Sequence, residues 1–412
     1  MREIAIIGAG QAGVQLAIGL QKQGLTVHLY SDRTAEAIRN GRVLSSQGVF
    51  HTALKYEREL GLNFWDNSCP PNTCIHFSIA DLVKKIPFIH WEGHTQYFYQ
   101  SIDQRLKIPA WMDFFEKLGG KIIIQSIDEE ALDTIIPSHD LTLIATGKGE
   151  MGQLFERDDE KSTFLQPARK LALVYLEGVE PYPYRGVSAN LIPNVGEYFI
   201  MPGLSLSGPC EMMFFEAIPG GPFDCWEDIN DANSIFHQGV KLLKEYIPWE
   251  AKRCAHAKVT DSQAFLRGSY TPVIRKPILK TRKNNIALGL GDAVVLNDPI
   301  AGQGANNASR AAKIYLESIG KNIAGSFDRT WMQETFNQWW EDVKWSTEWT
   351  NLFLMPPEPP VLELLRMAEK NPAMANFIAN AFDDPKQLLI YLKSEEKTKN
   401  FMARMALSEV VI

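Results

Sequence analysis

The residues best suited to chemistry lie in two glycine-rich segments that stand far apart in the sequence. The first is Gly8-Ala9-Gly10-Gln11-Ala12-Gly13, a GxGxxG pattern that directly follows an apolar strand and opens a helix. In this context the first glycine permits a tight turn, the second lets a pyrophosphate approach the backbone, and the third allows helix and strand to pack closely. The free amides at the helix N-terminus would then hold the anion, so the segment predicts a dinucleotide-binding loop.

The residues that grip the adenosine ribose of such a ligand are expected at the end of the second strand, about 20 residues after the glycines. The sequence there is Tyr30-Ser31-Asp32-Arg33. Asp32 would accept from the ribose hydroxyls, Ser31 would do so more weakly, and Arg33 would lie near the adenine or its phosphate. Alternatively, Asp32 only caps the turn that follows.

The second segment follows another buried strand and opens another helix. Gly291-Asp292 closes the strand, and Asp298-Pro299 precedes Gly302-Gln303-Gly304-Ala305-Asn306. Asp292 suits a polyol hydroxyl, while the amides of Gly304 to Asn306 would form a second helix N-terminus that stabilises negative charge. Ala145-Thr146-Gly147 ends a third strand of the same sheet. Two such helix ends on one ligand require a long dinucleotide, and the anionic ring of reduced flavin needs donors that nicotinamide does not, so the pattern predicts FAD.

Hydrophobic periodicity predicts the elements that position these segments. The strands are expected at residues 3–7, 25–30, 121–125, 141–145 and 286–289. The helices are expected at residues 12–23, 101–118 and 304–319. The first strand, helix and second strand form a β-α-β unit, for which parallel pairing with a right-handed crossover is the default.

The rest of the chain differs in pattern from this nucleotide-type unit. Residues 63–95 are irregular in pattern and predict strands and loops away from the first sheet. Residues 170–275 are mostly β, and residues 330–412 are helical with a break at Pro356 to Pro360. We therefore expect three units. They are a discontinuous FAD-binding domain (1–50, 95–165 and 276–325), a substrate-binding β domain (51–94 and 166–275) and a C-terminal helical region (326–412).

Composition excludes several classes of protein. The 42 basic and 49 acidic residues give a net charge of −7, so nothing marks a nucleic-acid or membrane partner. No apolar run approaches the ~18 residues of a membrane span, and the start lacks the features of a signal peptide. The five cysteines are odd in number and form no CxxC pair, and no histidines stand near them at zinc-ligand spacing. We expect reduced thiols, no metal site and a cytoplasmic protein.

Six segments of the chain resemble the two-component (external, group E) flavoprotein monooxygenases of the styrene and indole monooxygenase family. They are IIGAGQAGVQLA, VHLYSDR, GRVLSSQ, SIDQRLKIPAW, ATGKGEMGQLFE and, as the most specific, GLGDAVVLNDPIAGQGANNASRAA. The resemblance implies an α/β fold with a Rossmann-like FAD-binding domain of the glutathione-reductase and p-hydroxybenzoate-hydroxylase type. It also implies an enzyme that takes FADH2 from a separate NADH-dependent flavin reductase, forms a flavin C4a-hydroperoxide with O2, and epoxidises an aryl-conjugated alkene.

The segment Ser45-Ser46-Gln47-Gly48-Val49 is similar to the indole branch of that family, because the styrene branch has Asn and an apolar residue in place of this Ser and Gln. The resemblance implies that Ser45 and Gln47 face the flavin and substrate, where they would hold an indole N–H. The product would be the 2,3-epoxide, which leads to indoxyl and indigo, and styrene-type alkenes and sulfides are further expected substrates. Alternatively, this loop only shapes the flavin seat. Tyr99 replaces an expected small residue, which puts the volume of the pocket in question.

A peroxyflavin is electrophilic and the indole C2=C3 bond is electron-rich, so we expect no catalytic acid or base, only orientation and exclusion of water. The expected substrate pocket consists of Ser45, Gln47, Val49, Phe214, Phe215, Phe265 and Ile300. Pro299 would press on the edge of the flavin ring, and the amides after Gly302 would hold its anionic form. Arg42 and Arg105 would bind the pyrophosphate or the polar edge of the ring, since guanidinium groups match phosphate oxygens; either could instead belong to a surface ion pair.

Other interpretations stay open from the sequence. The chain could be a styrene monooxygenase proper, a single-component FAD aromatic hydroxylase or a non-catalytic FAD-binding protein. A flavin-dependent halogenase is a further alternative, against which the absence of the WxWxIP signature counts. His76, His90 and His94 are interpreted as structural. The tryptophan-rich segment from Trp331 to Trp349 is interpreted as a helix that packs on the core, with a docking face for a subunit or the reductase as the alternative. A homodimer is one oligomeric state that the sequence allows.

Overall fold

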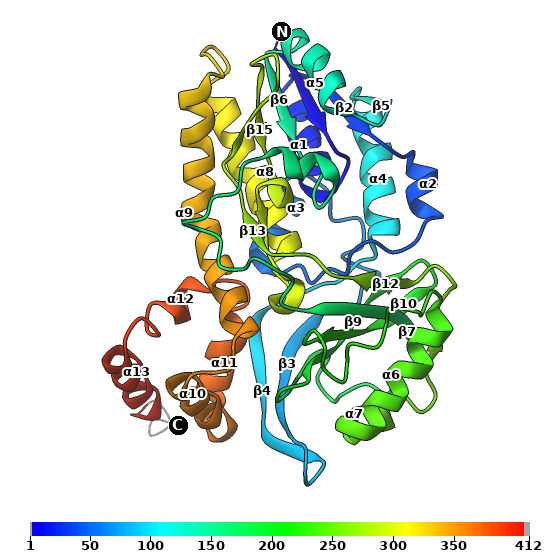
Figure 1. Cartoon of the computed structure of the whole chain (residues 1–412), viewed down its shortest axis with the longest axis vertical. Helices are drawn as coiled ribbons and strands as arrows, with labels where there is room; N and C mark the ends of the chain where they lie inside the picture. Colours follow the sequence, from blue (N-terminus) through cyan, green and yellow to red (C-terminus); the bar gives the residue numbers. More distant parts are fainter. Residues whose placement is uncertain (1, 408–412) are drawn as a thin grey trace.

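Two β-sheets and a C-terminal group of helices organise residues 2–407, which are the residues that the computed structural model describes. In Figure 1 the first sheet lies in the upper half of the molecule and the second sheet lies below it. The long helix α9 runs down one side, past both sheets. No helix in the described part of the chain is long and apolar enough to span a membrane.

The first sheet has six strands in the order β14-β15-β6-β1-β2-β5. Their bounds are β1 (Glu3–Ile7), β2 (Thr26–Ser31), β5 (Lys121–Ile124), β6 (Leu141–Ile144), β14 (Ile278–Lys280) and β15 (Ile286–Gly289). β1 pairs in parallel with both β2 and β6, as the β-α-β pattern predicts, and only the edge strand β14 is antiparallel. The central strands are short and apolar because helices cover both faces of such a sheet.

Helices pack around this sheet and carry its loops. Their bounds are α1 (Gln11–Lys22), α2 (Ala35–Arg39), α3 (His51–Glu59), α4 (Gln104–Lys117), α5 (Glu129–Ile135) and α8 (Gly304–Lys321), with short 3-10 turns η1 (Ile136–Ser138) and η2 (Glu150–Leu154). α1 packs against both α4 and α8, and α3 packs against α8. We therefore propose that α3 belongs with the nucleotide-type unit, although the expected boundaries give it to the β domain.

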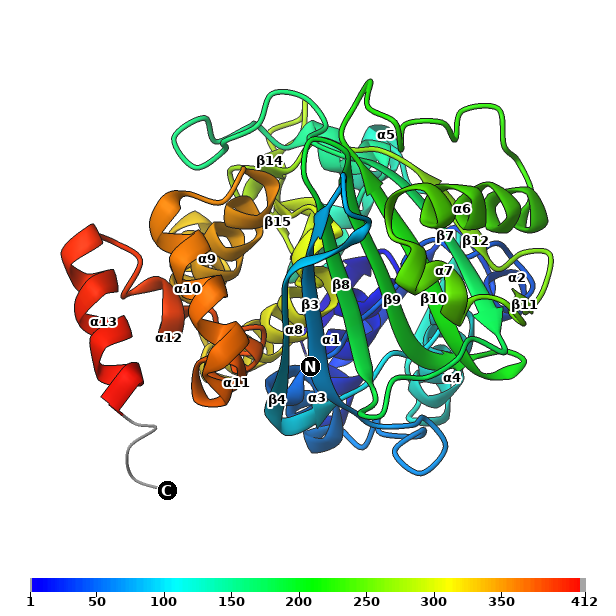
Figure 2. The ribbon, with the colours of Figure 1, turned by 90° about the horizontal axis from the view of Figure 1, so that it is seen from below.

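The second sheet has eight strands in the order β11-β7-β10-β9-β8-β3-β4, with β12 paired to β7. Their bounds are β3 (Asn72–Asp81), β4 (Ile86–Tyr99), β7 (Lys170–Glu177), β8 (Gly186–Ile192), β9 (Gly196–Ser205), β10 (Gly208–Ala217), β11 (Lys258–Val259) and β12 (Phe265–Gly268). Two helices that the sequence analysis did not foresee, α6 (Ala232–Tyr246) and α7 (Pro248–Arg253), lie against one face, as Figure 2 shows from below.

The prediction of strands and loops away from the first sheet at residues 63–95 is confirmed, because β3 and β4 form a long antiparallel pair of the second sheet. Pro87 lies inside β4, beside a register shift between Ile79 and Ala80. β4 is the edge strand of the sheet, where a residue without a backbone N–H is tolerated. Side chains from the C-terminal helices accept from three other exposed amides of β4, which closes this edge to further pairing.

The C-terminal region consists of α9 (Arg329–Leu354), α10 (Pro359–Lys370), α11 (Pro372–Asn380), α12 (Lys386–Leu389) and α13 (Glu395–Leu407). The predicted break before α10 is confirmed, since α9 ends at Leu354 and α10 begins at Pro359. Trp339 of α9 is buried in the core of the first sheet, whereas Trp349 is buried in the core that covers β3 and β4. The helix therefore packs on the core, as predicted. A small sheet of β13 (Val273–Ile274) and β16 (Val295–Leu296) leads from the second sheet back to the first.

Candidate active site

A cavity of about 570 Å³ lies between the two sheets, and both glycine-rich segments open into it. The first segment contributes Gly10, Gln11 and Ala12 to its wall, and the second contributes Gly302, Gly304 and Ala305. Neither α1 nor α8 has a side-chain cap at its N-terminus, so the backbone amides of both first turns are available to a ligand. The two helix ends thus reach one site, which is the arrangement that a long dinucleotide requires.

The three glycines of the first loop have different roles. Gly8 has a φ of +115°, and a Cβ on it would lie 2.5 Å from the carbonyl oxygen of Ala145. A Cβ on Gly13 would lie 2.0 Å from the carbonyl oxygen of Gly8. Around Gly10, by contrast, the nearest atom to such a Cβ is the Ala145 oxygen at 4.0 Å. Gly8 and Gly13 make the turn and the packing, while Gly10 leaves its space to a ligand.

A side groove of about 390 Å³ continues from the cavity along the end of β2. The groove and the cavity share Ala145, Thr146 and Gly147 at the end of β6. Further along, the groove is lined by Gly8, Ala9, Ser31, Asp32, Arg33 and Arg42. Asp32 is largely exposed and its carboxylate lies 3.4 Å from Arg33 Nε, while the Ser31 hydroxyl donates to the Arg33 carbonyl. The groove therefore offers acceptors and a cation where the ribose and phosphates of a dinucleotide are expected.

The loop before α8 begins with two short 3-10 turns, η3 (Gly291–Ala293) and η4 (Pro299–Ala301). The Asp298 carboxylate caps η4 by accepting from the amide of Ile300, and Gly302 takes the left-handed conformation (φ +64°) that ends the turn. Asp292, Pro299 and Ile300 line the cavity. Gly291, also at positive φ, only makes the turn and does not line the cavity, because Ala12 packs beside it.

Asn306 does not point to a ligand, which corrects its expected role as a direct contact. Its Nδ2 donates to the carbonyls of Gly48 and Gly302, both at 2.8 Å, and its Oδ1 accepts from the amide of Phe50 at 2.8 Å. These bonds use the whole side chain to fasten the 45–50 segment to the start of α8. Asn306 is therefore a positioning residue for the loop that carries Gln47.

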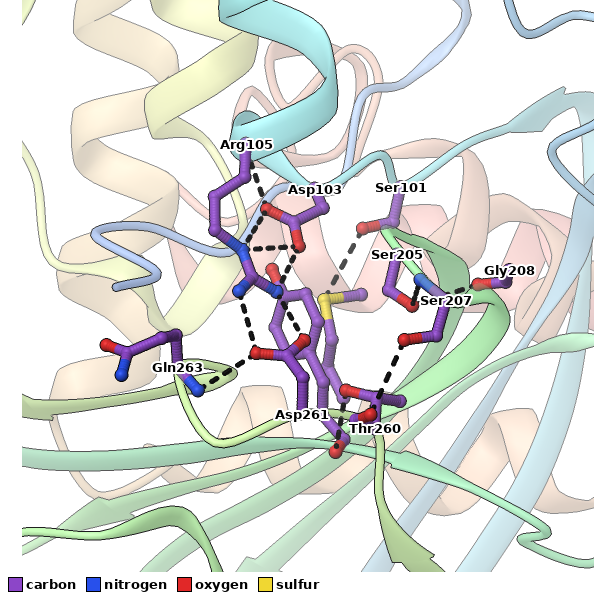
Figure 3. A network of polar contacts seen from close by, with 11 residues as sticks. Ser101, Asp103, Arg105, Ser205, Ser207, Gly208, Thr260, Asp261 and Gln263 are labelled. Atoms are coloured by element: carbon purple, nitrogen blue, oxygen red, sulfur yellow. Dashed lines mark hydrogen bonds and ion pairs between the residues drawn. The ribbon is translucent and has the colours of Figure 1, made fainter. Parts of the chain in front are cut away.

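Arg105 borders the groove but its guanidinium is committed elsewhere, which corrects its expected role at the pyrophosphate. Its Nη2 lies 2.7 Å from Asp103, and its Nη1 lies 2.9 Å from Asp261. Figure 3 shows the guanidinium enclosed by the two carboxylates, with Gln263 donating to Asp261 from the other side. The paired carboxylates raise the pKa of Arg105 against the opposing effect of burial, so it stays charged as a clamp between α4 and the loop before β12. Arg42 lines the groove and lies over the ring of Phe265.

The far end of the cavity is apolar and is formed largely by the second sheet. Ile75 and Phe77 of β3, Ala189 of β8 and Phe199 of β9 contribute to this wall, together with Phe353 and Phe382 of the C-terminal region. Tyr99 also lines it, and its hydroxyl donates to the Cys74 carbonyl and accepts from the Val187 amide. The large ring of Tyr99 is thus fixed in place, and it limits the volume beside β8.

Four of the seven expected pocket residues, Ser45, Gln47, Phe214 and Ile300, line the cavity, and three do not. Phe215 follows Phe214 in β10 and therefore points to the opposite face, into the core under α6. Phe265 of β12 belongs to the same core. Val49 pairs with Gln100 and packs against Ala53 and Leu54 of α3.

Gln47 is the polar side chain that stands out at this site. It is only 3% exposed, and its Oε1 has no hydrogen-bond partner in the protein. A buried amide oxygen without a donor is costly, so it marks a place where a ligand donor would be stabilised. Ser45, by contrast, donates to the neighbouring Ser46 carbonyl.

One charged side chain beside the cavity, Lys148, was not foreseen. Lys148 Nζ lies 3.9 Å from the centre of the Tyr270 ring, and exclusion of water lowers the pKa of Lys148 although Asp292 and Asp298 oppose this shift. Burial also raises the pKa of Asp292. The only sequence signal for Lys148 was its position directly after Thr146 and Gly147.

A buried carboxyl pair lies behind Pro299. Burial raises the pKa of Glu216 well above its usual range, and the nearby Asp298 carboxyl adds to this shift. Burial raises the pKa of Asp298 as well. Glu197 forms an ion pair with Arg169 at 2.6 Å on the same side of the site. Burial and mutual repulsion thus favour the neutral form of these two carboxyl groups.

Comparison with known proteins agrees with this architecture. Residues 147–253 match the family model described as the styrene monooxygenase A putative substrate binding domain. The chain is 28% identical to "Styrene monooxygenase StyA" of Pseudomonas fluorescens over 96% of both chains. It is 27% identical to a protein of the same name from a Pseudomonas species over 98% of both chains. These matches support the predicted resemblance of the chain to the styrene monooxygenase family.

Solved structures show the same fold at much lower sequence identity. The flavin-dependent brominase Bmp2 matches with a TM-score of 0.69 at 13% identity, over 99% of this chain and 98% of the brominase. A flavoprotein/dehydrogenase from Cytophaga hutchinsonii matches with a TM-score of 0.68 at 11% identity, over 99% of this chain and 100% of the other. The predicted fold class, a Rossmann-like FAD-binding fold with a β domain and a helical C-terminal region, is confirmed.

Proposed function

The chain is a flavin-dependent monooxygenase that uses FAD and dioxygen, and we propose that it epoxidises the C2=C3 bond of indole. The observation that carries the choice of indole is the unpartnered Oε1 of the buried Gln47 at the cavity wall. Indole offers an N–H that this oxygen would accept, whereas styrene has no donor. Styrene-type alkenes and sulfides would fit the same apolar wall without that bond.

We propose that the cofactor lies along both halves of the site. The pyrophosphate would rest on the amides that follow Gly10, the adenosine half would lie in the groove beside Ser31, Asp32, Arg33 and Arg42, and Asp292 would bind a polyol hydroxyl. The flavin ring would lie near Pro299 and the amides of Gly304 and Ala305. The uncapped N-termini of α1 and α8, which open into one cavity, support this arrangement.

When bound, the reduced flavin supplies the activated oxygen atom. The chain's own residues bind the substrate, orient it and keep water away. Ile75, Phe77, Phe199 and Phe214 give an apolar wall that excludes water from the reaction. Attack by an electron-rich double bond requires no nucleophilic side chain. Gln47 would accept from the indole N–H and so hold the indole double bond in one orientation.

We infer that a separate NADH-dependent flavin reductase supplies FADH2. The part of the chain that the structure describes has one GxGxxG segment at a strand-helix junction. The stretch Pro219-Gly220-Gly221-Pro222 lies in turns between β10 and α6 and has no helix N-terminus beside it. Single-component flavin monooxygenases also lack a second such segment, so the inference of a reductase rests on the similarity to the two proteins named styrene monooxygenase. A homodimer is a further part of the proposal.

The decisive experiment mixes the purified protein with chemically reduced FAD, oxygen and indole, without any nicotinamide. Formation of indoxyl and of blue indigo above the level of a protein-free control supports the proposal. Styrene is supplied in a parallel reaction. Styrene oxide formed much faster than indoxyl would contradict the choice of indole and favour a styrene monooxygenase. Bleaching of bound flavin by NADH or NADPH alone would contradict the separate reductase and favour a single-component hydroxylase.

A further inference from the structure

A cluster of metal-binding side chains lies on the face of the second sheet that points away from the cavity. Side chains alternate along a strand, so Ile75 and Phe77 of β3 face the cavity while Cys74 and His76 face the other side. In the β3–β4 pair, Cys74 stands opposite His94 and His76 stands opposite Glu92. Four potential ligands therefore share one face of two paired strands.

Three of these side chains already gather closely. The Cys74 thiol, one ring nitrogen of His76 and one carboxylate oxygen of Glu92 all lie within 4.8 Å of one another. His76 Nδ1 is 3.2 Å from Glu92 Oε2, and His94 Nε2 is 3.4 Å from Glu92 Oε1. Cys74 and His76 are fully or almost fully buried, while His94 is half-exposed at the rim. Cys74 and His76 thus form the buried part of the cluster, while Glu92 and His94 reach the surface.

The hydrogen bond between His76 and the Tyr184 carbonyl shows which ring nitrogen of His76 can bind a cation. Its Nε2 lies 2.7 Å from the carbonyl oxygen of Tyr184, and a carbonyl only accepts, so Nε2 carries the hydrogen. In the neutral ring Nδ1 then presents a lone pair toward the Glu92 carboxylate. Two lone-pair groups at this distance repel each other unless a cation lies between them. A backbone carbonyl on the other ring nitrogen is also the usual orienting contact of a metal-bound histidine.

The surroundings of His76 exclude water. The ring of Tyr182 stacks on the His76 ring at 4.2 Å. A divalent cation between Nδ1 and the Glu92 carboxylate would bind both lone pairs.

We propose that Cys74, His76 and Glu92 bind a zinc ion, with His94 as the fourth ligand. Thiolate, imidazole and carboxylate are the ligands that Zn²⁺ takes in proteins, and a set with no open position is typical of a structural site. One thiolate and one carboxylate balance the charge of the ion. The expectation that no metal ligands exist is revised because the residues meet across two strands, and spacing along the chain does not show this.

Binding of zinc releases one proton per ion. A free cysteine thiol is mostly protonated at neutral pH, so zinc displaces its proton on binding. The sulfur–zinc bond forms as the S–H bond breaks, and the proton passes to the buffer. The zinc also has a structural consequence for the active site. Cys74 and His76 alternate with Ile75 and Phe77, so fixing the ligands fixes two side chains of the cavity wall.

The test uses tag-free full-length protein that has been treated with a chelator. Zinc is titrated calorimetrically in two buffers of different ionisation enthalpy, and thermal unfolding is followed with and without zinc. The proposal requires binding of one ion per chain, release of about one proton, and a higher unfolding temperature. Cobalt in place of zinc should give a thiolate charge-transfer band. Absence of zinc binding, or a cobalt spectrum without that band, would overturn the proposal.

Variants locate the site. Cys74→Ser removes the thiolate and Glu92→Gln removes the carboxylate charge, and each should weaken zinc binding by more than about tenfold. Cys210→Ser is the matched control, because Cys210 is another buried thiol of the same sheet that lies outside the cluster. Glu92 is partly exposed, so its variant remains informative if Cys74→Ser does not fold. Zinc affinity that both variants retain would place the ion elsewhere and contradict the proposal.

Discussion

The side-chain amide of Gln11 donates to the backbone carbonyl of Ala305 at 3.3 Å, and so joins the first turn of α1 to the first turn of α8. The same Nε2 lies 3.1 Å from Glu57 Oε1, which also receives Lys107 Nζ at 2.5 Å. All four residues are buried or nearly so. The convergence of the two helix ends is therefore built into the protein by its own hydrogen bonds.

We predict different effects for alanine at two glycines of the first loop. Gly13→Ala should lower the free energy of unfolding by about 1–3 kcal/mol, because the new Cβ meets the Gly8 carbonyl and the backbone must shift. Gly10→Ala should leave stability almost unchanged, since its Cβ meets nothing closer than 4.0 Å. It should weaken FADH2 binding by roughly tenfold, or about 1.4 kcal/mol, because it fills space meant for the pyrophosphate. Denaturant unfolding and anaerobic flavin titration measure the two quantities. Equal losses of stability would contradict the assigned roles.

Asn306→Asp should destabilise the protein rather than only repel a reduced flavin. Aspartate cannot donate to the carbonyls of Gly48 and Gly302, and it places a charge among buried groups. We expect the free energy of unfolding to fall by about 1–3 kcal/mol, as for other buried groups that lose a partner. Asn351 is partly exposed, so Asn351→Asp serves as a control for the change of charge. If Asn306→Asp weakened flavin binding at unchanged stability, Asn306 would be a direct ligand after all.

Gln47→Leu should separate the two candidate substrates. The variant lacks the acceptor for an N–H, so the KM for indole should rise by roughly fivefold to tenfold, as expected for the loss of about 1–1.5 kcal/mol. The rate with styrene should persist, because styrene uses only the apolar wall. Steady-state kinetics with both substrates measures the effect, and Ser45→Ala is the matched control in the same loop. A parallel loss with both substrates would mean that Gln47 only shapes the loop.

The clamp around Arg105 predicts unequal effects for its two carboxylates. Asp103 is buried and caps α4, so Asp103→Asn should cost about 3–5 kcal/mol, as is typical when one partner of a buried ion pair is removed. Asp261 is partly exposed, and Asp261→Asn should cost about 1 kcal/mol or less because water compensates for the lost charge. Chemical denaturation of both variants measures these costs. A larger effect at Asp261 would contradict the described geometry.

Stability should fall with rising pH because of the carboxyl pair behind Pro299. The folded state raises the pKa of Glu216, so it binds a proton that the unfolded chain has released above about pH 4.3. The stabilising contribution of the neutral carboxyl is thus complete below that pH and is lost as pH rises through the folded-state value. Glu216→Gln, which stays neutral, should gain stability relative to the wild type between about pH 5 and about pH 8. Denaturant unfolding of both proteins at about pH 5 and at about pH 8 tests this prediction. A constant difference between the two proteins would contradict a raised pKa.

The sequence was sufficient where local geometry decides the outcome. The strand-turn-helix of the first loop, the parallel pairing of β1 and β2, and the strand before Gly291 all follow from short-range steric and packing rules. The face that a strand side chain occupies was harder to predict. Phe214 and Phe215 are neighbours of similar type, and only the register of β10 against β7 and β9 shows which of them reaches the cavity.

Long-range partners were beyond sequence reasoning. The sequence suggested Arg105 as a phosphate ligand. In the structure its guanidinium instead pairs with Asp261, which lies 156 positions further along the chain. Asn306 likewise appeared to be a ligand contact, and its partners lie in a loop more than 250 positions earlier. In both cases the sequence singled out a residue able to bind a ligand, but the groups that hydrogen-bond to its side chain come from distant segments of the chain. Helix α6 was missed because turn-rich neighbours obscured its amphipathic pattern.

The long helix α9 restricts how the enzyme can open. Its 26 residues span about 39 Å at 1.5 Å per residue, and they pack first on the upper core and then on the lower one. A hinge between the two sheets would have to break this continuous rod and expose tryptophans. Reactants must therefore enter and leave through shifts of individual loops and side chains, while the molecule as a whole behaves as a stiff frame.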